Sequence, residues 1–412
     1  MFKDCDIVIL SLIKWDGPVS SSPYALAKEF ARNNRVFYIN HPYSIKDVVK
    51  LEKNRNWINK FSMFSNSYQQ PQSGLPKLHT VTPCLTIPIN FLPEGLFYET
   101  LSQINDALVF ALIRRLIADF RIKKFVFINA FDSFYARRFP LNILQPVKKI
   151  YHSLDDISEV RYTALHGIRL EREMAVNYDL VLTSSAVLKS KLSAYASEIY
   201  MLPNGADTSL FNKAQIMDYP CPEELVPYQD RPIIGYTGSL EYRTDLELLN
   251  AIADGNPDKL ICIVGPVYSE EAVSSGFFER LNVLYCGSKQ LEQLPAYLKY
   301  MSCMIIPFKC NKLTSSIYPL KINEYLAAGK PVVSTGFSAE ILSFSDIISI
   351  ATDAISFNIL IDLAIQSDSP ELISLRMTRA SKNSWQTRVS EFWKILGEDE
   401  TEEVLNSYTR IN

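Results

Sequence analysis

The sequence lacks the features that mark several protein classes. Its 412 residues contain no uninterrupted apolar run long enough to span a bilayer, and the N-terminus does not read as a secretory signal. Seven cysteines are scattered without a Cys-x-x-Cys pair, and four histidines show no metal-ligand spacing. We therefore expect reduced thiols, no metal site, no cofactor and a cytoplasmic location.

The composition that is present fits a globular protein of two domains. Hydrophobic residues make up 47% and charged residues 21% of a chain too long for one core. Residues 1–205 hold 25 Lys and Arg against 18 Asp and Glu, whereas the remainder hold 17 against 27. This imbalance indicates an anionic partner for the first half, such as nucleic acid, a membrane surface or a phosphate-bearing lipid. A chance asymmetry among surface charges that have no binding role explains the imbalance equally well.

Strands and helices alternate along most of the chain. Apolar runs at 7–11 and 36–40 flank an expected helix, and a second α/β set starts at Pro232. Such alternation predicts parallel sheets, which bind ligands at the carboxyl ends of their strands. We expect an α/β fold with two Rossmann-like, doubly wound domains facing a cleft. The first domain is expected to span 1–205 with about 385–412, and the second 206–384.

The segment 318–333 predicts both a helix and a binding site for a phosphate group. Pro319 and Lys321 open an expected helix, Glu324 lies one turn in, and Gly329 follows its end. A helix N-terminus favours a phosphate, Lys321 adds a cation, and Glu324 is placed to accept hydrogen bonds from a sugar diol. An ordinary crossover with surface charges is the alternative.

Further candidates for phosphate binding follow expected strands. A glycine at Gly238 or Gly265 lets the backbone approach a phosphate, and Ser239 adjoins the first. Arg243 is placed either to reach a diphosphate or to pair with Glu241 or Asp245.

The first half offers candidates for a general base. Asp155 and Asp156 follow an expected strand that ends near His152, so they should lie at its carboxyl edge. For Asp156 the alternative is an N-cap, and for His152 it is a core position. Trp15, Asp16 and Gly17 occupy the loop after the first strand, where a plain turn is the alternative because no Gly-x-Gly-x-x-Gly pattern is present.

In combination these motifs resemble a known family. The second half is similar to the nucleotide-sugar domain of GT-B-fold glycosyltransferases, particularly bacterial family 4 and group 1 enzymes. The matching segments, in the family's order and spacing, are 234–240, 264–266, 283–287, 306–308 and 319–333. The first half looks like the acceptor domain through Trp15, 36–40, 151–156, Glu171 and 202–207. The resemblance covers about residues 5–396 and implies a C-terminal helix that crosses back onto the first domain.

The resemblance also implies an activity. It is the transfer of a sugar from a nucleotide diphosphate donor, chiefly a UDP-sugar, to a lipid-linked or polysaccharide acceptor in cell-surface glycan biosynthesis. In the family the position of Glu324 holds the ribose, and the loop with Gly17 faces donor phosphates and acceptor. Retaining members carry a glutamate where this chain has Ser316, so the choice between retaining and inverting chemistry stays open. The resemblance still implies that the diphosphate lies against Lys321 and the backbone of four residues: Thr314, Ser315, Ser316 and Ile317. Lys321 and a helix dipole would replace a metal.

Two other functions and a membrane contact remain open. A nucleotide-sugar epimerase would need paired acids, which only Asp155 and Asp156 offer, and a non-catalytic assembly partner would fit Ser316. A nucleic-acid binder is not expected, because no basic stripe interleaves with aromatics. A segment of mixed basic and apolar residues suits an interfacial helix on the inner face of the membrane, or else a solvated helix. Its basic residues are Lys46, Lys50, Lys53, Arg55 and Lys60.

Overall fold

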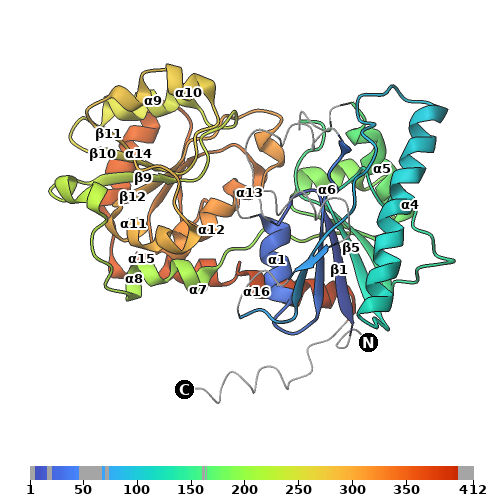
Figure 1. Cartoon of the computed structure of the whole chain (residues 1–412). Coiled ribbons are helices and arrows are strands. Elements are labelled where there is room, and N and C mark those ends of the chain that lie inside the picture. The colour runs from blue at the N-terminus through green and yellow to red at the C-terminus, as the bar shows by residue number, and fades with distance from the viewer. Residues whose placement is uncertain are drawn as a thin grey trace, which may run out of the picture. The chain divides into compact units, whose positions relative to one another are not determined.

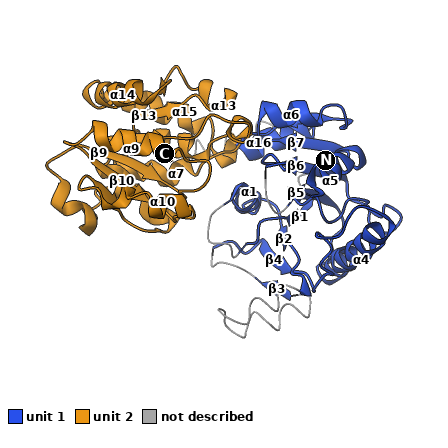
Figure 2. Ribbon diagram, turned by 90° about the horizontal axis from the view of Figure 1, so that it is seen from above, with its two compact units in different colours: residues 1–203, 388–412 blue, residues 204–387 orange. Residues whose placement is uncertain are grey.

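The protein forms two compact units, shown in separate colours in Figure 2. The computed structural model describes residues 5–15, 21–45, 67–69, 74–159, 163 and 165–397. The first unit is Met1–Pro203 with Arg388–Asn412, and the second is Asn204–Thr387. Each unit is built on one largely parallel sheet with helices packed on it, so the predicted α/β class with two Rossmann-like units is confirmed.

The sheet of the first unit has the strand order β3-β4-β2-β1-β5-β6-β7-β8 and is parallel except for β3. Its central strand β1 pairs with β2 on one side and β5 on the other, and all three are buried on both faces, as their unbroken apolar runs require. The strands are β1 (Asp6–Ser11), β2 (Val36–Asn40), β3 (Ser67–Gln69), β4 (Leu78–Thr82), β5 (Phe125–Ala130), β6 (Lys148–Ser153), β7 (Leu180–Thr183) and β8 (Ile199–Met201).

Helices cover both faces of this sheet (Figure 1). Those of the first unit are α1 (Ser22–Phe30), α4 (Leu96–Asp119), α5 (Gly167–Asn177), α6 (Ala186–Leu192) and, from Arg388 on, α16 (Trp385–Ile395). Helices α4 and α5 share one core with the sheet, which includes Val109 and Leu170. The C-terminal helix α16 packs beside α1, because the ring of Phe392 lies 4.9 Å from that of Phe30. The last helix therefore returns to the first unit, as the resemblance implied.

The sheet of the second unit is parallel throughout and has the order β11-β10-β9-β12-β13-β14. The order reverses between β9 and β12, which is where doubly wound sheets bind ligands. Its strands are β9 (Ile233–Thr237), β10 (Leu260–Val264), β11 (Val283–Tyr285), β12 (Cys303–Ile306), β13 (Val332–Thr335) and β14 (Ser349–Ala351).

Helices and short turns connect these strands. They are α7 (Thr208–Phe211), α8 (Lys213–Ile216), η2 (Glu223–Tyr228), α9 (Leu246–Gly255), α10 (Glu270–Ser274), η3 (Phe277–Glu279), η4 (Leu291–Gln293), α11 (Leu294–Tyr300), η5 (Thr314–Ser316), α12 (Leu320–Ala327), α13 (Ala339–Leu342), α14 (Ala354–Gln366) and α15 (Pro370–Ser381). Within the described ranges, no helix combines the length and apolarity needed to cross a membrane.

Candidate functional site

Two glycines meet at the carboxyl ends of β9 and β10. Gly238 has φ 125° and Gly265 has φ 147°, a region that side chains rarely allow. A Cβ atom on Gly265 would lie 2.2 Å from the carbonyl oxygen of Gly238, so only glycine lets the two loops touch. The Gly238 amide donates to Val264 O at 2.8 Å and the Gly265 amide to Gly287 O at 2.9 Å. The backbone itself thus fixes this turn.

Lys321 of α12 lies over this turn. A Cβ atom on Gly238 would come within 2.7 Å of Lys321 Nζ, so the missing side chain leaves room for the ammonium group. Nζ also lies 5.5 Å from the ring centre of Tyr236 and 5.6 Å from that of Phe308. Aromatic faces attract a cation at such distances. The structure therefore brings together Lys321 and Gly238, two of the candidate phosphate-binding residues.

Glu324 follows Lys321 by one turn on the same helix. Burial raises the pKa of its carboxyl group to about 7, against the opposing effect of the Lys321 charge. In the part of the chain that the structure describes, no side chain or amide donates a hydrogen bond to this carboxylate. Partly buried carboxylates normally have donors. Glu324 is therefore placed to accept hydrogen bonds from a bound molecule.

The backbone amides before α12 and at its N-terminus differ in whether they already donate hydrogen bonds. The N-terminus of α12 has no side-chain cap, so its first amides are available to an anion. The four residues before it differ, because their amides donate within the turn: Thr314 to Asn311 Oδ1, Ser315 to Asn311 O, Ser316 to Leu313 O and Ile317 to Thr314 O. In this conformation an anion would meet the end of α12 rather than the amides of η5.

Two further donor-site candidates are engaged inside the unit. Ser316 is fully buried, and its hydroxyl donates to Leu313 O at 2.7 Å, so this position presents no acid. Arg243 forms an ion pair with Glu241 at 2.6 Å, which is one of the two pairings that the sequence allowed. Ser239 follows Gly238 directly, and its carbonyl accepts a hydrogen bond from the Tyr236 hydroxyl at 2.9 Å.

In the first unit, the two candidate bases after β6 have different surroundings. Asp156 is buried, forms an ion pair with Lys191 of α6, and accepts hydrogen bonds from the amide and hydroxyl of Ser158. Burial raises the pKa of Asp156, but the bonds from Lys191 and Ser158 outweigh it and hold the pKa below its usual value. Asp155 is partly exposed. The alternative of an N-cap on the next helix is wrong for Asp156, because α5 begins only at Gly167.

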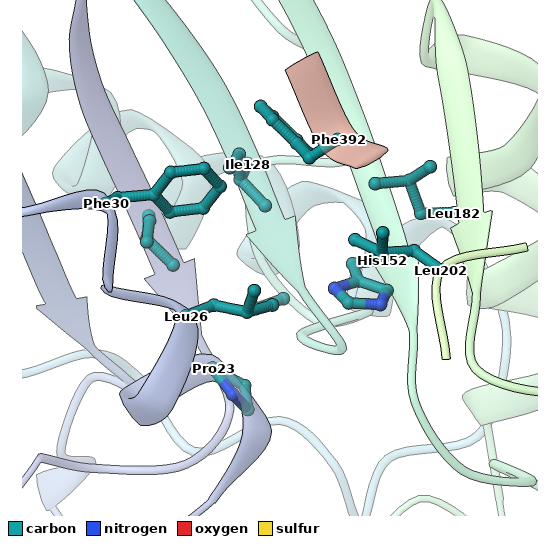
Figure 3. Close-up of a pocket in the computed structure, with 10 residues that line it drawn as sticks. Pro23, Leu26, Phe30, Ile128, His152, Leu182, Leu202 and Phe392 are labelled. Carbon is teal, nitrogen blue, oxygen red and sulfur yellow. The ribbon is translucent and has the colours of Figure 1, made fainter. Parts of the chain in front are cut away.

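His152 lies in the core of the first unit. Its ring lies among apolar side chains (Figure 3). They line a cavity of about 10 Å³, to which α1 contributes Leu26 and α16 contributes Phe392. Burial lowers the pKa of His152 to about 4, so the ring is neutral at pH 7. No described residue pairs with its Nε2 atom. The core position that the sequence offered as an alternative is the one observed.

The loop after β1 is described only up to Trp15. The amide of Trp15 donates to Asn40 Oδ1 at 2.7 Å, and its ring stacks 4.0 Å from that of Tyr24. Asp16 and Gly17 lie outside the described residues. The same holds for the five basic residues of the expected interfacial helix.

Sequence reasoning missed a buried pair at the same edge of the first sheet. His41 Nδ1 lies 2.7 Å from Asp132 Oδ2, and Asp132 is fully buried. His41 directly follows β2, and Asp132 lies two residues after β5, in a loop where Phe131 and Ala136 have φ 64° and 60°. Strain of this kind gathers at functional sites. The position just after a buried strand, which singled out Asp155 and Asp156, would have found both residues.

The described residues contain no group of three or more His, Cys, Asp or Glu side chains placed to hold a metal ion. That the reaction needs no metal ion remains a prediction, because a metal ion can also be bound by the substrate.

Two doubly wound units, with the C-terminal helix packed on the first, define the GT-B class of folds. Solved structures agree over nearly the whole chain. Sucrose-phosphate synthase of Thermosynechococcus elongatus superposes with a TM-score of 0.67 at 14% identity, over 95% of this chain and 98% of that one. Anabaena Alr3699/HepE in complex with UDP-glucose gives 0.63 at 14% identity, over 94% and 99%. The UDP-forming α,α-trehalose-phosphate synthase of Burkholderia xenovorans gives 0.68 at 11% identity, over 95% and 100%. These likenesses confirm the GT-B fold.

Sequence comparison gives a family match for part of the second unit and one curated relative. Residues 231–354 match the family model described as Glycosyl transferases group 1. TuaH of Bacillus subtilis (strain 168) is 29% identical over 147 residues, which cover 35% of this chain and 36% of TuaH. Its name assigns it, provisionally, to teichuronic acid biosynthesis as a glycosyltransferase. The chain thus matches about a third of the length of this relative, and the resemblance to group 1 glycosyltransferases is confirmed over the matched segment.

Proposed function

We propose that the chain is a glycosyltransferase that binds a UDP-sugar at the carboxyl edge of the second unit. The acceptor of the sugar is a lipid-linked or polysaccharide glycan. One observation carries the proposal: Lys321 lies over the Gly238 turn, and Glu324 follows one helical turn later without a donor. A cation beside a close-approach turn suits a diphosphate, and the carboxylate suits a ribose diol. Relatives whose titles name UDP and UDP-glucose support the uridine nucleotide, and the name of TuaH supports the acceptor class.

The residues of this site supply what departure of a nucleotide requires. Negative charge grows on the diphosphate as the glycosidic bond to it breaks, and preorganised positive groups stabilise that charge. Here these groups are the Lys321 ammonium and the uncapped N-terminus of α12. In this proposal the two together take the place of a metal ion, and Glu324 fixes the nucleoside end of the donor.

Thermal unfolding with a panel of nucleotides tests the proposal. UDP, GDP, dTDP, ADP and CMP are added singly at millimolar concentration, and the midpoint of unfolding is measured. A ligand present at 100 times its Kd stabilises the native state by about 2.7 kcal/mol. We expect a shift with UDP that exceeds the shift with each of the others. Protein that responds to none of the five does not bind a nucleotide donor, which contradicts the proposal.

The affinity for UDP should fall as the pH drops below 7. Only the ionised carboxylate of Glu324 accepts hydrogen bonds from both ribose hydroxyls, and burial raises its pKa to about 7. Protonation therefore removes the binding form below that pH, and we expect Kd to rise by about tenfold per pH unit there. Isothermal titration calorimetry between pH 5 and 8.5 measures the effect.

The Glu324→Gln variant is the matched control for this pH dependence. It keeps the shape of the side chain but cannot ionise, so its pH profile reports only the titration of the nucleotide's own phosphate. We expect weak binding with a shallower pH dependence than in the wild type, because only the phosphate, with a second pKa of about 6, still titrates. Equal slopes for wild type and variant would show that Glu324 does not contact the ribose.

Asp156→Asn should abolish sugar transfer and spare UDP binding. A general base contributes about 100- to 10,000-fold to rate, whereas the proposed nucleotide contacts come from the second unit. Lys191→Met separates two roles of this carboxylate, because it removes the ammonium that holds the Asp156 pKa low. If Asp156 is the base, this variant keeps transfer, and the acidic limb of its pH profile moves to higher pH. If both variants lose transfer alike, the ion pair serves only to hold the loop.

A non-catalytic assembly partner is the second candidate function, and Ser316 favours it. Its side chain is buried and bonded to Leu313 O, so the position where retaining relatives carry a glutamate offers no acid. This alternative predicts nucleotide binding without release of sugar from the donor. A donor-hydrolysis assay with UDP-sugars, run with and without a lipid-linked acceptor, distinguishes the two. No structural observation favours an epimerase.

An exposed apolar surface in the first unit supports a lipid-bearing acceptor or a membrane contact. Phe91, Leu96 and Phe97 are exposed by 69%, 90% and 67% at the start of α4. The N-terminal end of α5 lies beside them, because His166 Nε2 is 2.9 Å from Leu92 O. Replacing Leu96 and Phe97 together with serine should reduce sedimentation with phosphatidylglycerol vesicles. Leu281→Ser, which removes another exposed leucine, should not, and equal loss in both would dismiss the contact.

A further inference from the structure

Strands β9 and β12 are neighbours, but their ladder stops short of the carboxyl ends. The paired positions are Cys303 with Ile234 and Met304 with Gly235. On its other side β9 pairs with β10 as far as Thr237. The Gly238 amide donates to Val264 O of β10, so the Thr237 amide, one residue earlier, points to the β12 side. Thr237 is buried, and β12 does not supply its hydrogen bonds.

A side chain of α12 takes the place of the missing ladder bonds. The Tyr325 hydroxyl accepts from the Thr237 amide at 2.9 Å and from Thr237 Oγ1 at 3.3 Å, and it donates to Thr237 O at 3.1 Å. A phenol has one donor and two acceptor positions, so these three bonds satisfy it completely. Tyr325 is fully buried, and burial raises its pKa well above the usual value, which keeps the proton needed for the third bond.

We propose that Tyr325 is a positioning residue of the donor site, which ties α12 to the glycine turn so that Lys321 stands over Gly238. This inference rests on the proposed function. Thr237 directly precedes Gly238, and Tyr325 lies one turn after Lys321 on α12. The hydroxyl thus joins the two parts of the site where the strand order reverses. A change of this tie moves the ammonium relative to the turn that would carry the phosphates.

The affinity ratio of UDP to uridine separates this role from a merely structural one. Uridine lacks the diphosphate, so the ratio measures what the phosphate contacts add. A general loosening of the unit weakens both ligands alike and leaves the ratio unchanged, whereas displacement of Lys321 weakens UDP alone. Calorimetry at 10 °C, well below the unfolding transition, gives both constants on the intact chain.

The test uses Tyr325→Phe, with Tyr300→Phe as the matched control. The Tyr300 hydroxyl donates to Tyr219 O at 2.6 Å, so the control also removes one hydrogen-bonded hydroxyl from a tyrosine of the second unit. We expect the UDP-to-uridine ratio to fall about tenfold in Tyr325→Phe and to stay at the wild-type value in Tyr300→Phe. Thr237→Val keeps the amide and removes only the Oγ1 contact with Tyr325, so it should lower the UDP-to-uridine ratio about threefold. This variant tests the same role if Tyr325→Phe does not fold.

The outcomes distinguish this inference from the proposed function. Wild-type protein that binds UDP, together with an unchanged ratio in Tyr325→Phe and Thr237→Val, overturns the positioning role and leaves the donor site standing. Wild-type protein that does not bind UDP contradicts the proposed function and the role of Tyr325 with it. A ratio that falls equally in Tyr300→Phe also overturns the role, because the effect is then not specific to the tie.

Discussion

Lys321→Met should weaken UDP binding by about 100-fold and leave uridine binding unchanged. Hydrogen bonds to charged groups contribute about 1.5–3 kcal/mol, and 1.4 kcal/mol is a factor of ten in Kd. Lys321 is the side chain that lies closest over the Gly238 turn, and its Nζ lies 5.5 Å and 5.6 Å from the ring centres of Tyr236 and Phe308. Methionine keeps most of the apolar stem of the side chain and removes the ammonium group with its charge and its hydrogen-bond donors.

The control for this loss is another lysine of the second unit. Lys299 lies on α11, where its Nζ atom forms an ion pair with Asp218 at 2.9 Å. It contacts none of the residues named in the candidate site. Lys299→Met should bind UDP with wild-type affinity, which excludes a general effect of lowering the positive charge. The salt dependence adds a second check, because the variant at position 321 should lose most of the sensitivity of UDP binding to ionic strength. Unchanged affinity in Lys321→Met would remove the observation on which the proposed function rests.

The fold was predictable because its signals are local. Buried parallel strands appear as short apolar runs, and the helices between them have an apolar face, so two α/β sets are visible in the sequence. The positions of Gly238, Gly265 and Asp155 at the carboxyl ends of strands follow from the same alternation. Parallel strands end at one edge of the sheet, so residues that follow different strands gather there.

The parts of the site that sequence reasoning missed depend on contacts between distant residues. Tyr325 and Thr237 are 88 positions apart, and nothing near either of them indicates that a phenol would replace a ladder bond. The same holds for the Asp156 ion pair with Lys191, 35 positions away, which explains why an N-cap was a reasonable but wrong alternative. A local pattern cannot predict which buried side chain supplies the missing partner of a strand.

The backbone donors of η5 show a different limit. The expected diphosphate contact at 314–317 relied on free amides, but the Asn311 side chain and the turn itself use them. Turn residues such as Asn and Ser often bond to nearby backbone, and this competition is decided by geometry that spacing does not reveal. The uncapped N-terminus of α12, by contrast, follows from the sequence, because Pro319 in the N-cap position has no side-chain acceptor.

Alanine substitutions at three glycines should destabilise the protein in the order Gly265, Gly238, Gly287. All three have positive φ, so each alanine incurs backbone strain of about 1–3 kcal/mol. They differ in what the new Cβ atom meets. At Gly287 nothing lies within 4 Å, at Gly238 the Cβ meets the movable end of Lys321, and at Gly265 it meets the backbone of Gly238 at 2.2 Å.

Gly287→Ala is therefore the control for strain alone, with an expected loss of about 1 kcal/mol in the free energy of unfolding. Gly265→Ala adds an overlap with rigid backbone and should lose about 3–5 kcal/mol. Gly238→Ala should have a free energy of unfolding between those of the other two variants. Of the three it should lose the most UDP affinity relative to its loss of stability, because the new Cβ atom displaces the Lys321 ammonium. Urea denaturation and UDP calorimetry on the three variants measure both quantities. Equal destabilisation at Gly265 and Gly287 would show that the close approach of the two loops does not govern this turn, and full UDP affinity in Gly238→Ala would show that Lys321 does not act from above it.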